Sequence, residues 1–422
     1  MRYDIQDKVV LVLDYGSYIE VAERLARDYA KVYYFNPAVY NGYPQHDSSV
    51  IAMNVPGVIK VKEWASVIDE VDLVYFPDSH EPYLQYFFRS IGKAVFGSVF
   101  ACNLEHDRAF LNETLKGLGL PVATYYTPTG LDELEQYLLQ KKELYIKSSL
   151  RGDMETWRHT DPRLSKRLLK QMRYEMGLYE NKEKYIVQEP IDGIGEVGID
   201  PLCIDGVFAD LCPAGVEIKD AGYVCKMTYY QTLPAMIKNI TDKLGPVFKD
   251  CGYRGHYSNE IIISKDKRGF LLDNTCRVGQ PPGSIMMEMY TNYSEIVWEV
   301  ANGIFPNIQY QGPWGVQLII KSDMAENEPS PILIPEEVRR FVKIKNLSFD
   351  EEGTAYYSPL GGMKMREIGA VVGIGNTIDE AEKNAKQVAK AIEGLDIYVK
   401  VDAIDKAKKS LDKLSKSGIA FI

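Results

Sequence analysis

The sequence has no hydrophobic run approaching the ~20 residues that a membrane-spanning helix needs, and no signal-peptide stretch follows its start. Its six cysteines never form a Cys-x-x-Cys pair and only five histidines are present, so the spacing of a structural zinc site is missing. Dispersed cysteines are typical of free thiols in a reducing compartment rather than of a disulfide framework. We therefore expect a cytoplasmic protein that does not associate with a membrane.

Positive charge is also scarce. The 422 residues include 49 Lys and Arg against 59 Asp and Glu, which gives a net charge of −10. No nucleic-acid partner is expected, because binding to phosphates depends on an excess of Lys and Arg. Forty-five per cent of the residues are apolar, as in ordinary globular proteins, and at ~150 residues per domain the length predicts two to four domains.

The first hundred residues alternate short β-rich runs with helical patterns. The β-rich runs are 9–13, 32–35, 73–76 and 93–96. With the amphipathic stretch 19–29, this alternation predicts a parallel, doubly wound α/β sheet. The first turn, Asp14-Tyr15-Gly16-Ser17, contains a single glycine, so we interpret it as an ordinary turn from strand to helix.

From about Leu104 the order of elements becomes mixed, which predicts an α+β module. Helical patterns cover 105–118, 132–140 and a charged run to about 179. Strand patterns cover 144–147, 185–188, 260–263, 270–273, 370–373 and 396–401. A capping box at Thr377-Ile378-Asp379-Glu380 opens a helix between the last two.

The runs 260–263 and 270–273 predict a hairpin that carries carboxylates. Side chains alternate along a strand, so Asp273, Thr275 and Arg277 share one face, which Glu260 on the preceding strand can reach. Two carboxylates and an arginine suit a Mg²⁺ ion that bridges phosphate oxygens. A simple ion pair between Asp273 and Arg277 is the alternative, and spacing alone favours that pair.

Three weaker signals precede the hairpin. Lys147 ends an apolar strand just before a polar loop, where an ammonium group can hold nucleotide phosphates. The strand 185–188 runs into Glu189-Pro190, whose backbone could meet an adenine edge, and Glu196 could accept hydrogen bonds from ribose hydroxyls. Taken singly, these are better interpreted as a surface lysine, an ordinary strand end and a solvated carboxylate.

In this order the residues resemble the ATP-grasp superfamily, and within it the phosphoribosylamine–glycine ligase family. The resemblance is carried by Ala94-Val-Phe-Gly97-Ser98, Leu104-Glu105-His106-Asp107-Arg108, Gly119-Leu-Pro-Val122, Ile146-Lys147, Tyr253-Arg254-Gly255 and the segment 369–377 with its following helix. It implies a doubly wound pre-ATP-grasp domain (1–104), an ATP-grasp domain (105–345) and a small C-terminal α+β domain (346–422). ATP would bind between a lid and adenine-binding part (105–190) and a metal and catalytic part (191–345).

The resemblance also implies ATP and Mg²⁺ (or Mn²⁺) as cofactors and assigns residues to them. The nucleotide would meet Arg108, Lys147, Gln188, Glu189, Ile191 and Glu196. The metal would be held by Glu260, Asp273 and Thr275. The candidates for holding a carboxylate or acyl phosphate are Arg277, Lys219 and Arg151, with surface salt bridges as the alternative.

The sequence departs from that family in both the ATP-binding half and the substrate half, and the ATP-binding half is the better matched of the two. Thr275 stands where the family has Asn, and the nearby Asn274 points to the opposite face of a regular strand. The loop after Lys147 has one glycine where the family has several, and no Gly-rich substrate loop is found at 217–222. Gly279-Gln280-Pro281-Pro282 replaces the family's Gly-Asp-Pro-Glu.

The activity implied is ADP-forming ligation of a small-molecule carboxylate to an amine through an acyl phosphate. The departures predict substrates other than glycine and phosphoribosylamine. Three alternatives stay open: a true phosphoribosylamine–glycine ligase of purine synthesis, a biotin-carboxylase-like enzyme, and a non-catalytic nucleotide-binding relative. We expect a monomer or a homodimer.

Overall fold

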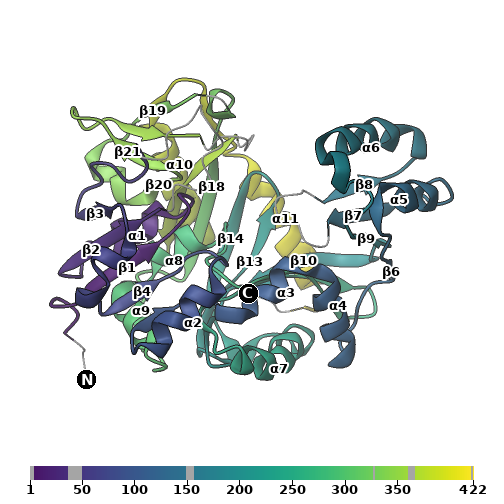
Figure 1. The fold of residues 1–422 in the computed structure, drawn as a ribbon, viewed down its shortest axis with the longest axis horizontal. Coiled ribbons are helices and arrows are strands. Elements are labelled where there is room, and N and C mark those ends of the chain that lie inside the picture. Colours follow the sequence, from purple (N-terminus) through teal and green to yellow (C-terminus); the bar gives the residue numbers. More distant parts are fainter. Residues whose placement is uncertain (1–3, 37–49, 149–155, 327, 360–365, 420–421) are drawn as a thin grey trace.

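The computed structural model describes residues 4–36, 50–148, 156–326, 328–359, 366–419 and 422 (Figure 1). Across these residues no helix combines the length and the apolar character that crossing a bilayer requires. All six cysteines are free, and all except Cys251 are buried.

The N-terminal part forms a five-stranded parallel sheet of order β3-β2-β1-β4-β5. Its strands are β1 (Val9–Leu13), β2 (Lys31–Phe35), β3 (Val58–Val61), β4 (Leu73–Tyr75) and β5 (Ala94–Phe96). Helix α1 (Ile19–Leu25) follows β1, and α2 (Pro82–Ser90) joins β4 to β5. The doubly wound sheet predicted from the alternation is confirmed. Residues 10–13 of β1 are buried throughout, as expected for a central parallel strand.

Two short helices, α3 (Asn103–His106) and α4 (Arg108–Gly117), lead out of this sheet. The sequence predicts one helix over 105–118, but the backbone breaks at Asp107. The side chain of Asp107 accepts hydrogen bonds from the backbone N–H groups of Ala109 and Phe110 and so caps α4. A carboxylate suited to an N-cap therefore starts a second helix instead of continuing the first.

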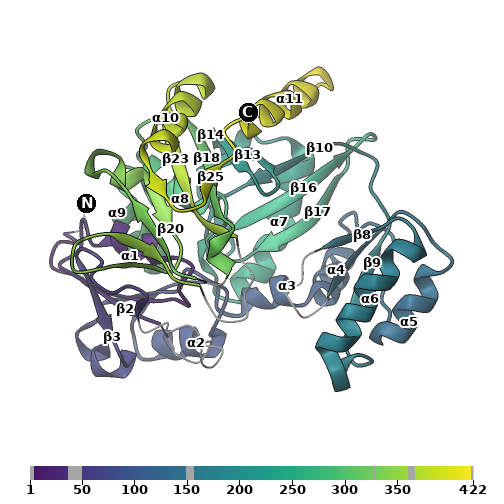
Figure 2. The same ribbon diagram turned by 90° about the horizontal axis from the view of Figure 1, so that it is seen from above.

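A small antiparallel sheet of order β6-β9-β7-β8 follows, and it projects from the rest of the molecule (Figures 1 and 2). Its strands are β6 (Tyr125–Tyr126), β7 (Leu144–Ser148), β8 (Trp157–His159) and β9 (Tyr185–Gln188). Helices α5 (Gly130–Leu138) and α6 (Pro162–Met176) pack on it around a separate apolar core that includes Leu134, Ile146 and Leu169. We call residues 125–188 the lid.

The centre of the molecule is a nine-stranded antiparallel sheet of order β17-β16-β10-β13-β14-β18-β23-β20, with β25 pairing to β18. Its strands are β10 (Gly193–Ile199), β13 (Leu211–Ile218), β14 (Gly222–Tyr229), β16 (Ser258–Ser264), β17 (Gly269–Thr275), β18 (Trp314–Ser322), β20 (Val342–Ile344), β23 (Glu367–Gly375) and β25 (Ile397–Val399). The sheet continues across the boundary expected at 345/346, because β23 lies between β18 and β20.

Two smaller sheets complete the fold. One contains β11 (Leu202–Ile204), β12 (Val207–Phe208) and β15 (Arg254–His256), and the other β19 (Ser330–Leu333), β21 (Leu347–Phe349), β22 (Ala355–Tyr357) and β24 (Glu393–Gly394). The remaining helices are α7 (Ala235–Asp250), α8 (Gly283–Met289), α9 (Tyr293–Ala301), α10 (Ile378–Ala391) and α11 (Ala403–Lys416). The capping box is confirmed, since Thr377 accepts from the backbone N–H of Glu380 and α10 begins at Ile378.

Helices α10 and α11 lie along one side of the central sheet (Figure 2). Helix α11 packs on β10, β13 and β14, where Leu414 covers Gly195 so closely that a side chain at position 195 would meet it. The sequence prediction missed α11, although Ile404, Ala407 and Leu414 recur at helical spacing and are buried. This C-terminal helix therefore supports the back of the strands that carry the candidate site.

Candidate functional site

The hairpin β16–β17 brings the predicted metal ligands together. Glu260 lies directly opposite Asp273, and Ser258 lies opposite Thr275, with a β-bulge after Glu260. Asn274 points to the other face, where its side chain accepts a hydrogen bond from Tyr257 and donates one to the sulfur of Cys276. The alternation predicted from the sequence is thus present in the structure. Asn274 makes its side-chain hydrogen bonds on the face opposite to Asp273 and Thr275.

Two cations meet Asp273 from different parts of the chain. Arg108, at the start of α4, places Nη1 2.6 Å from Asp273 Oδ1. Lys147, on β7 of the lid, places Nζ 3.5 Å from the same oxygen and also donates to the carbonyl of Leu272 at 3.3 Å. The Lys147 side chain is only 10% exposed. Burial lowers the pKa of Lys147, and Asp273 opposes that effect.

Carboxylates crowd the opposite side of this group. Glu196 on β10 and Glu217 on β13 face Glu260 and Asp273. Burial, followed by the hydrogen bond and the charge of Glu196, raises the pKa of Glu260 to about 10. Partial desolvation and the charge of Glu196 likewise raise the pKa of Glu217 to about 8, although part of the Glu217 side chain is exposed. Like charges held this closely favour either protonation or a bound cation.

The donor set fits a hard divalent ion that also binds phosphate. Among the described residues, no three Asp, Glu, His or Cys side chains form a metal site on their own. Glu260 and Asp273 would therefore supply two anionic oxygens, with the Thr275 hydroxyl on the same face. Mg²⁺ takes its remaining ligands from water and substrate phosphates in sites of this kind, so these residues fit a Mg²⁺–nucleotide complex.

The residues expected near adenine lie where the lid joins the central sheet. Gln188 ends β9, and the backbone N–H of Glu189 donates to the carbonyl of Thr124 on the neighbouring segment. Ile191 lies two residues before β10 begins. Glu196 is exposed, as the interpretation of a solvated carboxylate expects, but it lies on strand β10 beside Glu260 rather than in a loop.

Arg277 has a partner that spacing could not reveal. Its Nε donates to Glu105 Oε1 at 2.8 Å, and the other oxygen of Glu105 accepts from the backbone N–H of Cys276 at 2.9 Å. Its Nη1 donates to the hydroxyl of Tyr18 at 2.6 Å. The alternative of an Asp273–Arg277 ion pair is wrong, because the two side chains pair with different elements. Glu105 was missed as a site residue, although it lies inside the segment that carries the resemblance.

The segment after Arg277 docks on the N-terminal sheet. The backbone N–H of Val278 donates to the carbonyl of Pro77, and the side-chain amide of Gln280 donates to the carbonyl of Ser17 at 2.8 Å. Of the other two catalytic candidates, Lys219 is exposed in the turn between β13 and β14, and Arg151 lies outside the described residues.

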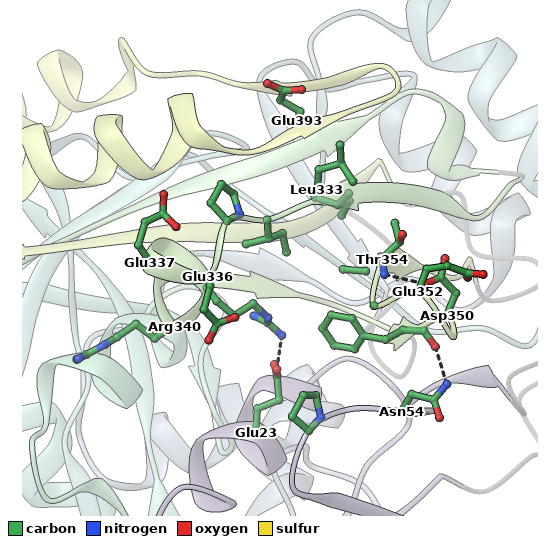
Figure 3. A pocket seen from close by; sticks show the side chains of 18 of the residues that line it. Glu23, Asn54, Leu333, Glu336, Glu337, Arg340, Asp350, Glu352, Thr354 and Glu393 are labelled. Atoms are coloured by element: carbon green, nitrogen blue, oxygen red, sulfur yellow. Dashed lines mark hydrogen bonds and ion pairs between the residues drawn. The ribbon is translucent and has the colours of Figure 1, made fainter.

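A cavity of about 1000 Å³ lies elsewhere, between the N-terminal part and the segments around β19 and β21 (Figure 3). Its arginines are engaged in ion pairs with acids, as Arg339 is with Glu23. The side chains labelled around it are largely acidic, including Glu336, Glu352 and Glu393. Such a lining repels phosphates, and none of the predicted site residues belongs to it.

The sequence matches no protein-family model and no curated protein. The fold, however, is similar to several solved structures. Phosphoribosylamine–glycine ligase from Thermotoga maritima aligns with a TM-score of 0.70 and 15% identity over 93% of this chain and 98% of that one. The biotin carboxylase domain of 2-oxoglutarate carboxylase from Hydrogenobacter thermophilus was solved with MgADP and bicarbonate. It aligns with a TM-score of 0.65 and 11% identity over 97% of this chain and 98% of that one.

L-amino acid ligase from Bacillus licheniformis gives a TM-score of 0.57 and 14% identity over 92% of this chain and 99% of that one. These proteins are ATP-grasp enzymes, and the chain has the ATP-grasp fold. At identities of 11–15%, structural similarity shows that the fold is shared but does not identify the substrate.

Proposed function

We propose that this protein is an ATP-dependent ligase that joins a small carboxylate to an amine and releases ADP and phosphate. The observation that carries the proposal is the meeting of Lys147 and Arg108 at Asp273, opposite Glu260. Cations from the lid and from α4 lie beside paired carboxylates on the central sheet. This arrangement suits a polyphosphate with its metal, since phosphoryl transfer depends mainly on positioning and charge neutralisation.

Nucleotide binding would redistribute these contacts. Lys147 and Arg108 would exchange Asp273 for phosphate oxygens, while Glu260, Asp273 and the Thr275 hydroxyl would hold Mg²⁺ or Mn²⁺. The metal would neutralise the negative charge of the phosphates and relieve the crowding of carboxylates around Glu260. Gln188, Glu189 and Ile191 would border the adenine, and Glu196 the ribose.

The substrate carboxylate would lie beyond the phosphates, at Arg277. A carboxylate oxygen takes the γ-phosphoryl group to give an acyl phosphate, which the amine then attacks at carbon. Arg277 is held by Glu105 and Tyr18, so its guanidinium is oriented before the substrate arrives. Lys219 and Arg151 remain candidates for a second contact with the substrate.

The substrates are proposed to differ from glycine and phosphoribosylamine. The segment 279–282 has no carboxylate where that family has two. Its Gln280 amide is occupied by the backbone of Ser17. A site that lacks the charged partners of one substrate discriminates strongly against it.

Two measurements test the proposal. Calorimetry with a non-hydrolysable ATP analogue and Mg²⁺ should show binding, and no heat at millimolar ligand would refute nucleotide binding. A screen of amino acids and amines for ADP release should then identify the substrate pair. Turnover of glycine with freshly made phosphoribosylamine at ordinary metabolic rates would instead make the chain a purine-pathway ligase. The absence of ADP with every pair would favour a non-catalytic nucleotide-binding relative.

A biotin-carboxylase-like reaction is the second candidate, because the fold is also similar to a biotin carboxylase domain. Its intermediate would be carboxyphosphate, formed from bicarbonate rather than from an organic acid. Bicarbonate-dependent ADP release that avidin abolishes in the presence of a biotinyl partner would support this candidate over the ligase.

A further inference from the structure

A second group of polar side chains lies where the strand order of the N-terminal sheet reverses, between β1 and β4. The strand order β3-β2-β1-β4-β5 places β2 and β3 on one side of β1, and β4 and β5 on the other. In sheets of this kind the carboxyl ends of the two strands at that point border a crevice where ligands bind. Here the residues after β1 are 14–17 and those after β4 are 76–81. Arg277 contacts Tyr18, which directly follows the first segment, and Asp78, which lies in the second.

His106 reaches this crevice from α3. Its Nε2 lies 2.8 Å from Ser79 Oγ, and Ser79 is 3% exposed. Ser79 Oγ in turn donates to Asp78 Oδ1 at 3.4 Å. A serine hydroxyl has one proton, so when that proton goes to Asp78 the oxygen must accept from the N–H at His106 Nε2. His106 Nδ1 is then left with its lone pair.

Asp78 and the residue before His106 also contact Arg277. Glu105, which precedes His106, accepts from Arg277 Nε, and Asp78 Oδ1 lies 3.5 Å from that nitrogen. Asp78 therefore contacts both Arg277 and Ser79. The imidazole is placed next to the position proposed for the acyl phosphate.

The protonation state of His106 suits an acceptor. Burial, the largest effect, lowers the pKa of His106 below its ordinary 6.5. His80 and Arg277 act in the same direction, whereas Glu105 and Asp78 raise the pKa. At neutral pH the ring is therefore uncharged, as a general base must be.

We propose that His106, oriented by Ser79, accepts the proton that the amine substrate must lose during ligation. This inference rests on the proposed ligase function. The substrate amine enters as an ammonium ion and gives one proton to His106 Nδ1, which frees the lone pair of its nitrogen. That nitrogen forms a bond to the acyl carbon as the bond from that carbon to the phosphate oxygen breaks, and phosphate leaves with the electron pair and takes up the second proton of the nitrogen. Ser79 acts through His106 and is a positioning residue.

The first test needs no substrate. Nitrogen-15 NMR of the histidine rings, recorded on the full chain, should show His106 neutral at pH 7 with its proton on Nε2. The five histidines allow assignment through loss of one signal in His106→Gln. Ser79→Ala should shift the proton toward Nδ1. A protonated ring, or a proton on Nδ1 in the parent protein, would overturn the proposal.

The second test is kinetic and uses the carboxylate and amine that the ADP-release screen identifies. In the parent, kcat/KM should rise with pH along an acidic limb below pH 6.5. His106→Gln should lose that limb and ~10²–10⁴-fold of its activity, the usual contribution of a general base. His80→Gln, the matched neighbour, should keep the limb. With hydroxylamine, which is unprotonated at neutral pH, His106→Gln should form hydroxamate at nearly the parent rate.

The outcomes separate this inference from the function on which it rests. Parent protein that forms no ADP with any pair refutes the ligase itself. Parent protein that forms ADP, with a His106→Gln variant of unchanged pH profile, refutes only the role of His106. Equal losses with the amine and with hydroxylamine would make His106 a structural residue and would also refute the proposal.

Discussion

Replacing Lys147 by methionine tests the nucleotide site most directly. Methionine keeps the length and the apolar contacts of the lysine stem but removes its charge. In the absence of nucleotide, Asp273 keeps Arg108 as a partner at 2.6 Å, so no carboxylate is left unpaired. The variant should therefore fold, and its defect should be confined to binding.

The size of the defect follows from burial. A hydrogen bond to a charged group contributes ~1.5–3 kcal/mol, and a Lys147 side chain that is only 10% exposed belongs in the upper half of that range. A loss of ~2–3 kcal/mol of binding free energy raises the Kd for MgATP by ~30–150-fold, because each ~1.4 kcal/mol corresponds to a factor of ten. Stability should change by less than ~1 kcal/mol, because Asp273 is 40% exposed and such pairs contribute little.

Calorimetry with a non-hydrolysable ATP analogue and Mg²⁺ measures the first quantity, and thermal unfolding the second. Lys184→Met is the matched control, since Lys184 is an exposed lysine of the same lid, and it should bind like the parent. A Lys147→Met variant that binds within threefold of the parent would refute the reasoning. A Tm lowered by much more than ~2 °C would mean that the charge is needed for folding instead.

Other parts of the structure are tested by four further substitutions. Glu260→Gln and Asp273→Asn should each remove most Mg²⁺-dependent ADP formation and leave the fold intact, because an amide holds a hard cation more weakly than a carboxylate; parent-like turnover would refute the metal assignment. Thr275→Asn should be tolerated in the same assay, since position 275 shares the strand face of Asp273. Burial alone would raise the pKa of Glu288, but Lys343 and neighbouring arginines lower it to about 2. Urea unfolding should therefore show Glu288→Gln less stable by ~3 kcal/mol at neutral pH. This difference should hold above the ordinary pKa of 4.5 and shrink as the pH falls toward 2; a difference independent of pH would contradict it.

Features encoded by local periodicity could be predicted from the sequence. The parallel sheet followed from alternating runs, and the shared face of Glu260 and Asp273 followed from the period of a strand. Sequence order supplied the resemblance to ATP-grasp enzymes, and the similarity to solved structures confirms the fold that this resemblance implies. These features depend on neighbours within a few residues or on one hairpin.

What could not be predicted depends on contacts between distant segments. Arg277 pairs with Glu105, 172 positions away, and no spacing rule selects that partner over Asp273. Glu196 joins the carboxylates only because β10 pairs with β16. Helix α11 was missed because its apolar stripe is narrow among many lysines and becomes clear only against the sheet that it covers.

Two ion pairs determine which parts of the site can move. They attach α3 and α4 to strand β17 and to the residues that follow it. Glu105 pairs with Arg277, and Arg108 with Asp273. The signs alternate along both segments, so a slip of one helical turn would bring like charges together. Lys243 also donates to the carbonyl of Leu118 at the end of α4.

Helix α4 is therefore anchored to the centre of the molecule, and any swing of the lid must start after it, in the connections 119–124 and 189–192. Such a swing carries Lys147 away and leaves Arg108 in place. We expect an incoming nucleotide to contact Arg108, which does not move, before it contacts Lys147, which moves with the lid. The lid would then close in the same step that forms the last contact with the phosphates.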